Sequence, residues 1–168
     1  MLYHLRRRGK ADLYREDVLT GMEGDYMVSP ASGKVLRADE NLISIFMRIY
    51  DDHTNVAPLD GVVSEIKYER GSFFPAFLKR SEGNEKNTIR LATAYGDVKI
   101  VQVAGCLIRR IRCDVRVGER VKRGQPIGRI YFGSRVDVTL PMGFSPTVRR
   151  GQGVKRGNTV IAERAETT

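Results

Sequence analysis

Apolar and polar residues alternate in short stretches along much of the chain. Residues 110–117 alternate strictly over eight positions, which places Ile111, Cys113 and Val115 on one side and arginines on the other. Such alternation is typical of an antiparallel strand with one buried face, so we expect Cys113 in the core. Residues 136–140 alternate in the same way, whereas residues 41–50 are mostly apolar and predict a strand buried on both faces. Helix is predicted only near residues 10–19 and just before Ser81.

A glycine-containing pattern occurs twice, 33 residues apart. The motif Val-x-x-Gly-x-x-Val-Lys-Arg-Gly begins at Val115 and again at Val148, and a shorter motif, Pro-x-x-Gly-x-Val, begins at Pro30 and Pro58. Glycine at these positions predicts tight turns with positive φ. Four such units predict a mostly β fold, a compact barrel-sandwich hybrid with internal pseudo-repeats and little helix. The pattern resembles biotinyl/lipoyl domains, and it also resembles small RNA-binding β-barrels.

Composition narrows the class of protein. The 168 residues suit one domain with a real core, and two cysteines are too few for a disulfide-stapled secreted scaffold. No apolar run reaches the 18 residues that a membrane-spanning helix needs, and the N-terminus lacks the apolar segment of a signal peptide. We therefore expect a soluble, intracellular domain.

Positive charge is concentrated in one part of the chain. Residues 109–156 contain 13 Lys and Arg against three Asp and Glu, a net charge of +10 within a total of +9. This segregation favours a polyanionic partner, either nucleic acid or an anionic membrane surface. The alternative is a solvated basic face that only aids solubility.

Few residues are candidates for chemistry. His53 follows Asp51 and Asp52, whose carboxylates would favour the charged imidazole and suit acid/base work, although an Asp-rich turn explains the same pattern. The two cysteines lie seven residues apart with no nearby histidine, so no metal site is expected. The dipeptide Gly133-Ser134 lies between the two glycine repeats, where a strained backbone is plausible, whereas Gly71-Ser72 has no such setting.

Six blocks of sequence, in order between Val28 and Ala162, resemble a known family. They are residues 29–35 (Ser-Pro-Ala-Ser-Gly-Lys-Val), Ile45-Phe46 with 51–58 (Asp-Asp-His-Thr-Asn-Val-Ala-Pro), 71–77, 81–87, 101–111 and 132–136 (Phe-Gly-Ser-Arg-Val). Together they resemble the pyruvoyl-dependent phosphatidylserine decarboxylases, in the short form found in archaea and many bacteria.

The resemblance implies a self-cleaving enzyme. In the family, a serine hydroxyl attacks the preceding glycine carbonyl, and the serine becomes a pyruvoyl group at a new N-terminus. Carried over here, the cut falls between Gly133 and Ser134, and the covalent pyruvoyl cofactor derives from Ser134. The chain would comprise a basic N-terminal segment, 1–27, and a single β domain, 28–168, cut into a large chain, 1–133, and a small chain, 134–168. His53, supported by Asp51, matches the family position linked to decarboxylation.

The resemblance also implies the substrate and the partners. The reaction would be that of a carboxy-lyase, in which the pyruvoyl ketone forms a Schiff base with a serine phospholipid and releases carbon dioxide and the ethanolamine lipid. Phosphatidylserine and archaetidylserine both fit as substrates. The expected partners are the small chain and an anionic membrane surface, and a homo-oligomer stays open. Nucleic acid is not expected, because the arginines lack interleaved aromatics. We expect peripheral attachment at the cytoplasmic side of the cell membrane.

Some residues depart from the family pattern. Ser32 occupies the position of a family aspartate that belongs to the processing triad of long members, and Val56 replaces a histidine or arginine. The base for self-cleavage could then be Asp51 with His53, or Asp60. The N-terminus also lacks the apolar membrane segment common in short members. The alternative function is a non-processed, non-catalytic β-barrel module that binds RNA or anionic lipid through residues 109–156. A third candidate is a lipoate or biotin carrier modified at Lys34, which lacks the sequence context of a carrier lysine.

Overall fold

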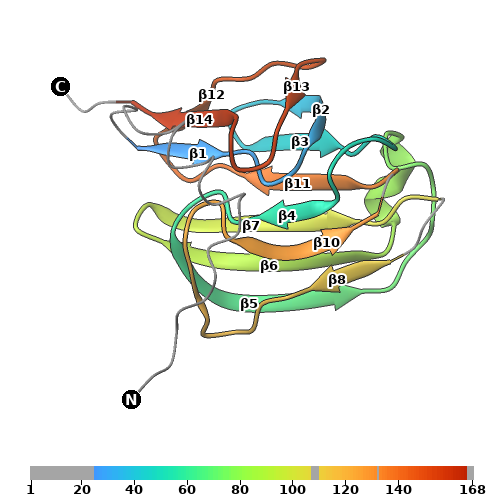
Figure 1. Cartoon of the computed structure of the whole chain (residues 1–168), viewed down its shortest axis with the longest axis horizontal. Helices are drawn as coiled ribbons and strands as arrows, with labels where there is room; N and C mark the ends of the chain where they lie inside the picture. Colours follow the sequence, from blue (N-terminus) through green and yellow to red (C-terminus); the bar gives the residue numbers. More distant parts are fainter. Residues whose placement is uncertain (1–24, 107–109, 132, 166–168) are drawn as a thin grey trace.

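The described residues form strands and one short 3-10 helix (Figure 1). A computed structural model describes residues 25–106, 110–131 and 133–165. The elements are β1 (Tyr26–Val28), β2 (Gly33–Ala38), β3 (Leu42–Phe46), β4 (Thr54–Val56), β5 (Gly61–Glu69), η1 (Lys79–Gly83), β6 (Lys86–Thr93), β7 (Gly96–Val103), β8 (Ile111–Cys113), β9 (Arg120–Val121), β10 (Pro126–Ile130), β11 (Arg135–Thr139), β12 (Phe144–Pro146), β13 (Gly153–Val154) and β14 (Val160–Arg164). The expected mostly β fold is confirmed.

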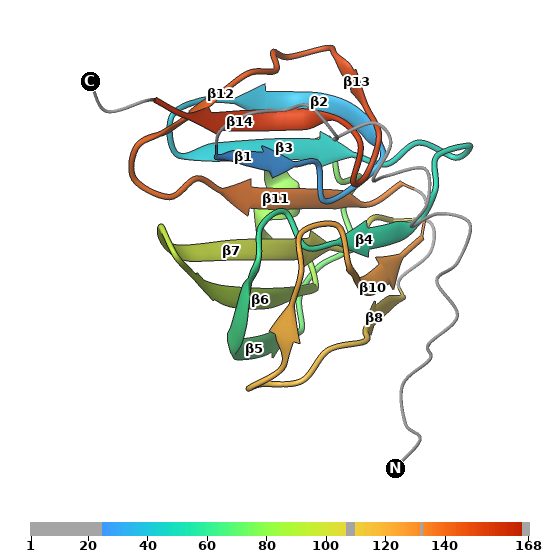
Figure 2. The same cartoon turned by 60° about the vertical axis from the view of Figure 1, so that its left-hand side comes forward.

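Three antiparallel sheets enclose the core. The largest is a curled eight-stranded sheet with the order β13-β2-β3-β11-β7-β6-β5-β9, and the two smaller sheets have the orders β1-β14-β12 and β4-β10-β8. Figures 1 and 2 both show β1, β12 and β14 beside β2 and β3, and β4, β8 and β10 beside β5, β6 and β7. Apolar side chains from all three sheets are fully buried between them, among them Met27, Ile45, Ile100, Ile130 and Ile161. Burial of these side chains is the main favourable contribution to folding.

The internal repeats determine which strands form the edges of the large sheet. Each downstream glycine unit pairs with an upstream one: Val154 of β13 lies opposite Gly33 of β2, and Val121 of β9 lies opposite Gly61 of β5. Matching backbone hydrogen bonds join the two halves, from Gly157 N to Ser29 O (2.9 Å) and from Gly124 N to Ala57 O (2.6 Å). The predicted pseudo-repeat is therefore confirmed as a spatial one.

The glycines of the two repeat types have different roles. Gly118, Gly124, Gly151 and Gly157 have φ values of +91°, +77°, +90° and +70°, as expected for tight turns. Gly33 instead permits close approach of two strands, because a Cβ added there would lie 2.0 Å from the carbonyl oxygen of Phe46.

The predicted long strand at 41–50 is wrong beyond Phe46. Strand β3 ends there, and although Met47 is still fully buried, Ile49 and Tyr50 are 70% and 78% exposed. The chain turns because the Asp51 carboxylate accepts a hydrogen bond from the Arg48 N–H (2.7 Å). An aspartate that bonds a nearby backbone amide competes with a sheet ladder in this way.

The predicted strand at 110–117 is also shorter than expected. Strand β8 covers only Ile111–Cys113, and a turn follows in which the Glu119 carboxylate accepts from the Arg116 N–H (3.0 Å). Cys113, predicted to lie in the core, is only partly buried and packs against the edge of the core. Strand β11 confirms the alternating stretch at 136–140, and the short helix occurs as η1, which contains Ser81. The predicted helix at 10–19 lies outside the described residues.

Candidate active site

The Gly133–Ser134 peptide bond lies between β10 and β11 and is held by backbone contacts. The Gly133 N–H donates to the carbonyl oxygen of Met47, and the Met47 N–H donates to that of Ser134, both at 2.9 Å. Met47 directly follows β3, the sheet neighbour of β11. Ser134 is fully buried, and Gly133 has a φ of +78°, which favours glycine. This linkage is therefore held in a fixed conformation.

A second glycine lies against the same peptide bond. A Cβ added to Gly105, in the segment after β7, would lie 2.0 Å from the carbonyl oxygen of Gly133 and 2.7 Å from its carbonyl carbon. Only a residue without a side chain permits this approach. Gly105 lies in the block 101–111 that resembles the family, but its role was not predicted, because the contact joins segments far apart in the chain.

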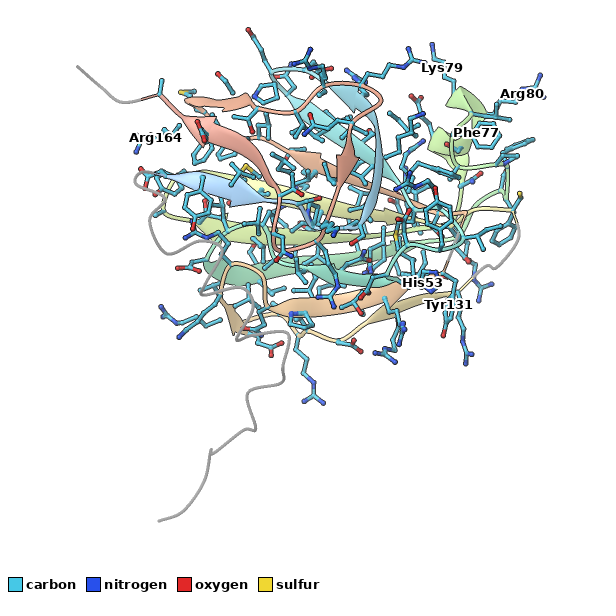
Figure 3. All side chains as sticks on the ribbon, turned by 45° about the horizontal axis from the view of Figure 1, so that its top comes forward. His53, Phe77, Lys79, Arg80, Tyr131 and Arg164 are labelled. Carbon is cyan, nitrogen blue, oxygen red and sulfur yellow. The ribbon has the colours of Figure 1, made fainter. Side chains whose placement is uncertain are left out.

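Tyr131 contacts both Ser134 and His53, the first through its backbone carbonyl and the second through its ring. The Ser134 hydroxyl donates to the carbonyl oxygen of Tyr131. The ring of Tyr131 lies 5.9 Å from that of His53 between centroids, and the Ile130 N–H donates to the His53 carbonyl oxygen (3.2 Å). Figure 3 shows His53 and Tyr131 side by side at one end of the molecule. Two residues predicted to be functional, His53 and Ser134, are thus brought to the same region.

Asp51 shapes the loop that precedes His53. Its carboxylate binds the guanidinium of Arg48, with distances of 2.9 Å to Nε and 3.2 Å to Nη2. The support of His53 by Asp51 stays a prediction. The neighbouring Asp52 pairs with Arg156 at 3.0 Å. Burial opposes ionisation of Asp52, but hydrogen bonds from Arg156 and the Thr54 N–H lower the pKa of its carboxyl on balance.

Ser32 and Asp60 occupy equivalent turns of the pseudo-repeat. The Ser32 hydroxyl accepts from the Arg156 N–H (3.0 Å), and the Asp60 carboxylate accepts from the Arg123 N–H (2.6 Å). The two arginines are themselves repeat partners. Ser32 therefore retains the turn contact that a carboxylate makes in the other half. It also lines a groove of about 1010 Å3, together with Asp51, Asp52, Thr54 and Arg156.

Replacing Ser32 with alanine should destabilise the protein, because the partly buried Arg156 N–H loses its acceptor. We expect a loss of about 1–2 kcal/mol in the free energy of unfolding. Ser32→Asp should retain the contact, as should the reciprocal change Asp60→Ser. Urea denaturation of the three variants tests this, and equal stability of Ser32→Ala and the unmodified protein would contradict it.

A series of buried side-chain hydrogen bonds ends at the side chain of Met47. The side-chain amide of Asn87 donates to Oε1 of Gln102, and the side-chain amide of Gln102 donates to Oδ1 of Asn55, both at 3.0 Å. Asn55 in turn approaches the Met47 sulfur at 3.8 Å. All three amide side chains are nearly or fully buried. This polar chain joins β6, β7 and β4 to the residue that holds the Gly133–Ser134 bond.

Arg135, the residue after Ser134, is anchored inside the protein. Its Nη1 donates to the carbonyl oxygen of Ala76 (3.0 Å) and to the Ser81 hydroxyl (2.5 Å), and its Nε lies 2.9 Å from an Asp137 oxygen. Through Arg135, Ser134 is connected to η1 and to the segment just before it. Val56, which replaces a histidine or arginine of the family pattern, is fully buried. Among the described residues, no group of three His, Cys, Asp or Glu side chains could hold a metal ion.

Comparison with known proteins connects this chain to a family. The family model of phosphatidylserine decarboxylase matches residues 18–162. A protein of Methanosarcina mazei, provisionally named an archaetidylserine decarboxylase proenzyme, is 47% identical over 137 residues, which make up 82% of this chain and 66% of the relative. The phosphatidylserine decarboxylase proenzyme of Solidesulfovibrio magneticus is 40% identical over 156 residues, or 86% of this chain and 73% of the relative. The chain thus spans just under two thirds of the length of the archaeal relative.

Proposed function

The chain belongs to the phosphatidylserine decarboxylase family, and we propose that it is a proenzyme that cleaves itself between Gly133 and Ser134 and then decarboxylates a serine phospholipid. The observation that carries the proposal is the fixed geometry of this peptide bond. Met47 binds it on both sides, Gly105 places no side chain of its own against the Gly133 carbonyl, and Gly133 adopts a positive φ. Fixing the reacting groups lowers the entropic barrier to an intramolecular attack.

Self-cleavage would begin with the Ser134 hydroxyl. Its oxygen attacks the Gly133 carbonyl carbon, the C–N bond breaks, and the nitrogen takes up a proton, which leaves an ester. Loss of the Ser134 α-proton then breaks the Cβ–Oγ bond and releases Gly133 as a carboxylate. Water replaces the nitrogen of residue 134, which departs as ammonia, and a ketone remains. The hydroxyl proton must leave the carbonyl of Tyr131 for a stronger base, and we assign that role to His53.

The surroundings of residue 134 fit a pyruvoyl group. The residue is fully buried, and the Met47 N–H holds its carbonyl oxygen at 2.9 Å. A pyruvoyl group at this position supplies a ketone that binds the amine of the substrate and takes up the electron pair left by carbon dioxide. His53 would then return a proton to the substrate carbon. The names of the relatives leave ester-linked and ether-linked serine lipids as candidate substrates.

The small chain would stay bound after the cut. It would carry β11, which lies between β3 and β7 in the middle of the large sheet, and also β12, β13 and β14. Arg135 would hold its new N-terminus against Ala76 and Ser81. Cleavage therefore breaks one peptide bond without removing a strand from the core.

Intact-mass measurement tests the proposal. We expect the unmodified protein to yield chains 1–133 and 134–168, the smaller being one ammonia lighter than a chain that begins with serine. Ser134→Ala should yield a single species of 18.9 kDa. Ser72→Ala alters the chain's other Gly-Ser dipeptide and is the matched control, which should be cleaved as usual. A single uncut species in an active preparation of the unmodified protein would falsify the pyruvoyl mechanism.

We propose that the protein is a peripheral membrane protein that attaches to the cytoplasmic surface of the cell membrane. None of the helices in the described ranges is both long and apolar enough to span a bilayer. The basic segment, residues 109–156, does not form one free basic surface. Arg112 and Arg156 pair with Asp114 and Asp52, Arg123 packs on the ring of Tyr26, and Arg135 is buried. Membrane contact through that segment alone is therefore weaker than its charge implies.

A further inference from the structure

Large apolar side chains are exposed mainly in two segments. Of the eight that the described residues expose, five lie either just after β3 or just before η1. We call these five the apolar rim: Ile49, Tyr50, Phe74, Phe77 and Leu78. Their exposed fractions range from 39% to 78%. A group of exposed apolar side chains of this kind indicates an interaction surface.

Each rim segment adjoins residues that contact the Ser134 site. The ring of Phe46, at the end of β3, contacts that of Phe77 edge-on, with centroids 5.8 Å apart. Arg135 binds the carbonyl oxygen of Ala76, and Met47 binds both sides of the Gly133–Ser134 bond. Figure 3 shows Phe77 at the same end of the molecule as His53 and Tyr131, and Arg164 at the opposite end.

Cations flank the rim. Lys79 and Arg80 directly follow Leu78, and both are exposed. Neither forms a salt bridge with a described residue, and the Arg80 guanidinium lies 6.0 Å from the Phe74 ring centre. Figure 3 shows both side chains projecting outward beside Phe77. Aromatic and aliphatic side chains with adjacent exposed cations match the interface of an anionic bilayer, where aromatic rings lie at the level of the head groups.

We infer that the apolar rim, with Lys79 and Arg80, inserts into the surface of an anionic membrane and thereby presents the Ser134 site to lipid head groups, an inference that rests on the proposed function. The membrane is favoured over a second copy of this chain because the rim consists of loop side chains beside positive charge. A self-complementary interface would have to bring like charges together. The same contact explains how a buried site reaches a substrate that stays in the bilayer.

Vesicle binding tests the inference, with Ser134→Ala as the parent protein so that cleavage does not affect the result. The probes are vesicles of phosphatidylcholine with phosphatidylglycerol and vesicles of phosphatidylcholine alone. Ile49→Ser with Phe77→Ser should lower the vesicle partition coefficient by roughly tenfold for each apolar side chain removed. Val117→Ser with Met142→Ser, which changes two exposed apolar residues elsewhere, is the matched control and should leave binding unchanged.

A second pair of variants separates the rim from the predicted basic segment. Lys79→Ser with Arg80→Ser should weaken binding to the anionic vesicles by roughly fivefold per charge. Arg149→Ser with Arg150→Ser removes two exposed arginines beyond β12 and should have little effect. Unchanged binding of the rim variants, or a larger loss from the Arg149 and Arg150 changes, would overturn the inference. So would rim variants that alter only the oligomeric state, because the rim would then be an interface between copies.

Activity measurements distinguish this inference from the proposed function. In the cleavable protein, the rim variants should cleave themselves normally and act normally on a short-chain, water-soluble phosphatidylserine, while losing activity on vesicles. Normal self-cleavage also shows that the variants are folded. If the unmodified protein is neither cut nor active on either substrate, the proposed function fails, and the vesicle-binding results still decide the role of the rim.

Discussion

Gly105→Ala is expected to slow self-cleavage by about 100-fold or more, because a displacement of about 1 Å at a reacting centre can have that effect. The added Cβ would lie 2.0 Å from the carbonyl oxygen of Gly133, far inside van der Waals contact. The atoms that it meets belong to the backbone of the bond to be cut, which Met47 already holds at both ends. Movement of this carbonyl away from Gly105 would misalign it with the Ser134 hydroxyl. The rate of appearance of the small chain, followed by intact mass, measures the effect.

Gly61→Ala is the matched control for Gly105→Ala. A Cβ at Gly61 would lie 2.7 Å from the carbonyl oxygen of Ala92, so it also crowds a backbone carbonyl, in the pairing of β5 with β6. Both variants should lose about 1–3 kcal/mol of stability by overpacking. Only Gly105→Ala should slow cleavage when the rate is normalised to the folded fraction. Equal rates per folded molecule in the two variants would show that Gly105 does not position the carbonyl.

The strand pattern and the repeats could be predicted because they are local properties of the sequence. Alternation predicts β11, and the spaced glycines predict the turns at Gly118 and Gly151. The ends of strands depend on single side chains that bond the backbone. Asp51 ends the extended chain after β3, and Glu119 closes the turn after β8. Hydrophobic periodicity carries no information about such competing bonds, so both strands were predicted too long.

Candidate site residues could be predicted only where a side chain would itself perform the chemistry. Ser134 and His53 are residue types with recognisable reactivity, and the family resemblance assigns their positions. Met47 and Gly105 contribute backbone atoms or the absence of a side chain, which no residue type signals. Their contacts also join segments that are far apart in the chain, so only the folded structure brings them together.

Gln102→Leu is expected to lower the free energy of unfolding by about 2–5 kcal/mol, because two buried polar groups lose their partners at once. The Asn87 amide would lose its acceptor and the Asn55 carbonyl oxygen its donor, with no solvent access to either. Leucine is close in size to glutamine, so the loss would not reflect a large cavity. Urea denaturation in the Ser134→Ala background, where a single chain unfolds, measures the change.

Thr88→Val is the control for the polar chain. Thr88 adjoins Asn87 in β6 but is only partly buried, and valine preserves its shape and its strand propensity. This change should shift stability by no more than about 0.5 kcal/mol. Because Asn55 contacts the Met47 sulfur, Gln102→Leu should also slow self-cleavage in the cleavable protein, whereas Thr88→Val should not. A destabilised Gln102→Leu that still cleaves at the normal rate would mean that the polar chain stabilises the fold without positioning the Gly133–Ser134 bond.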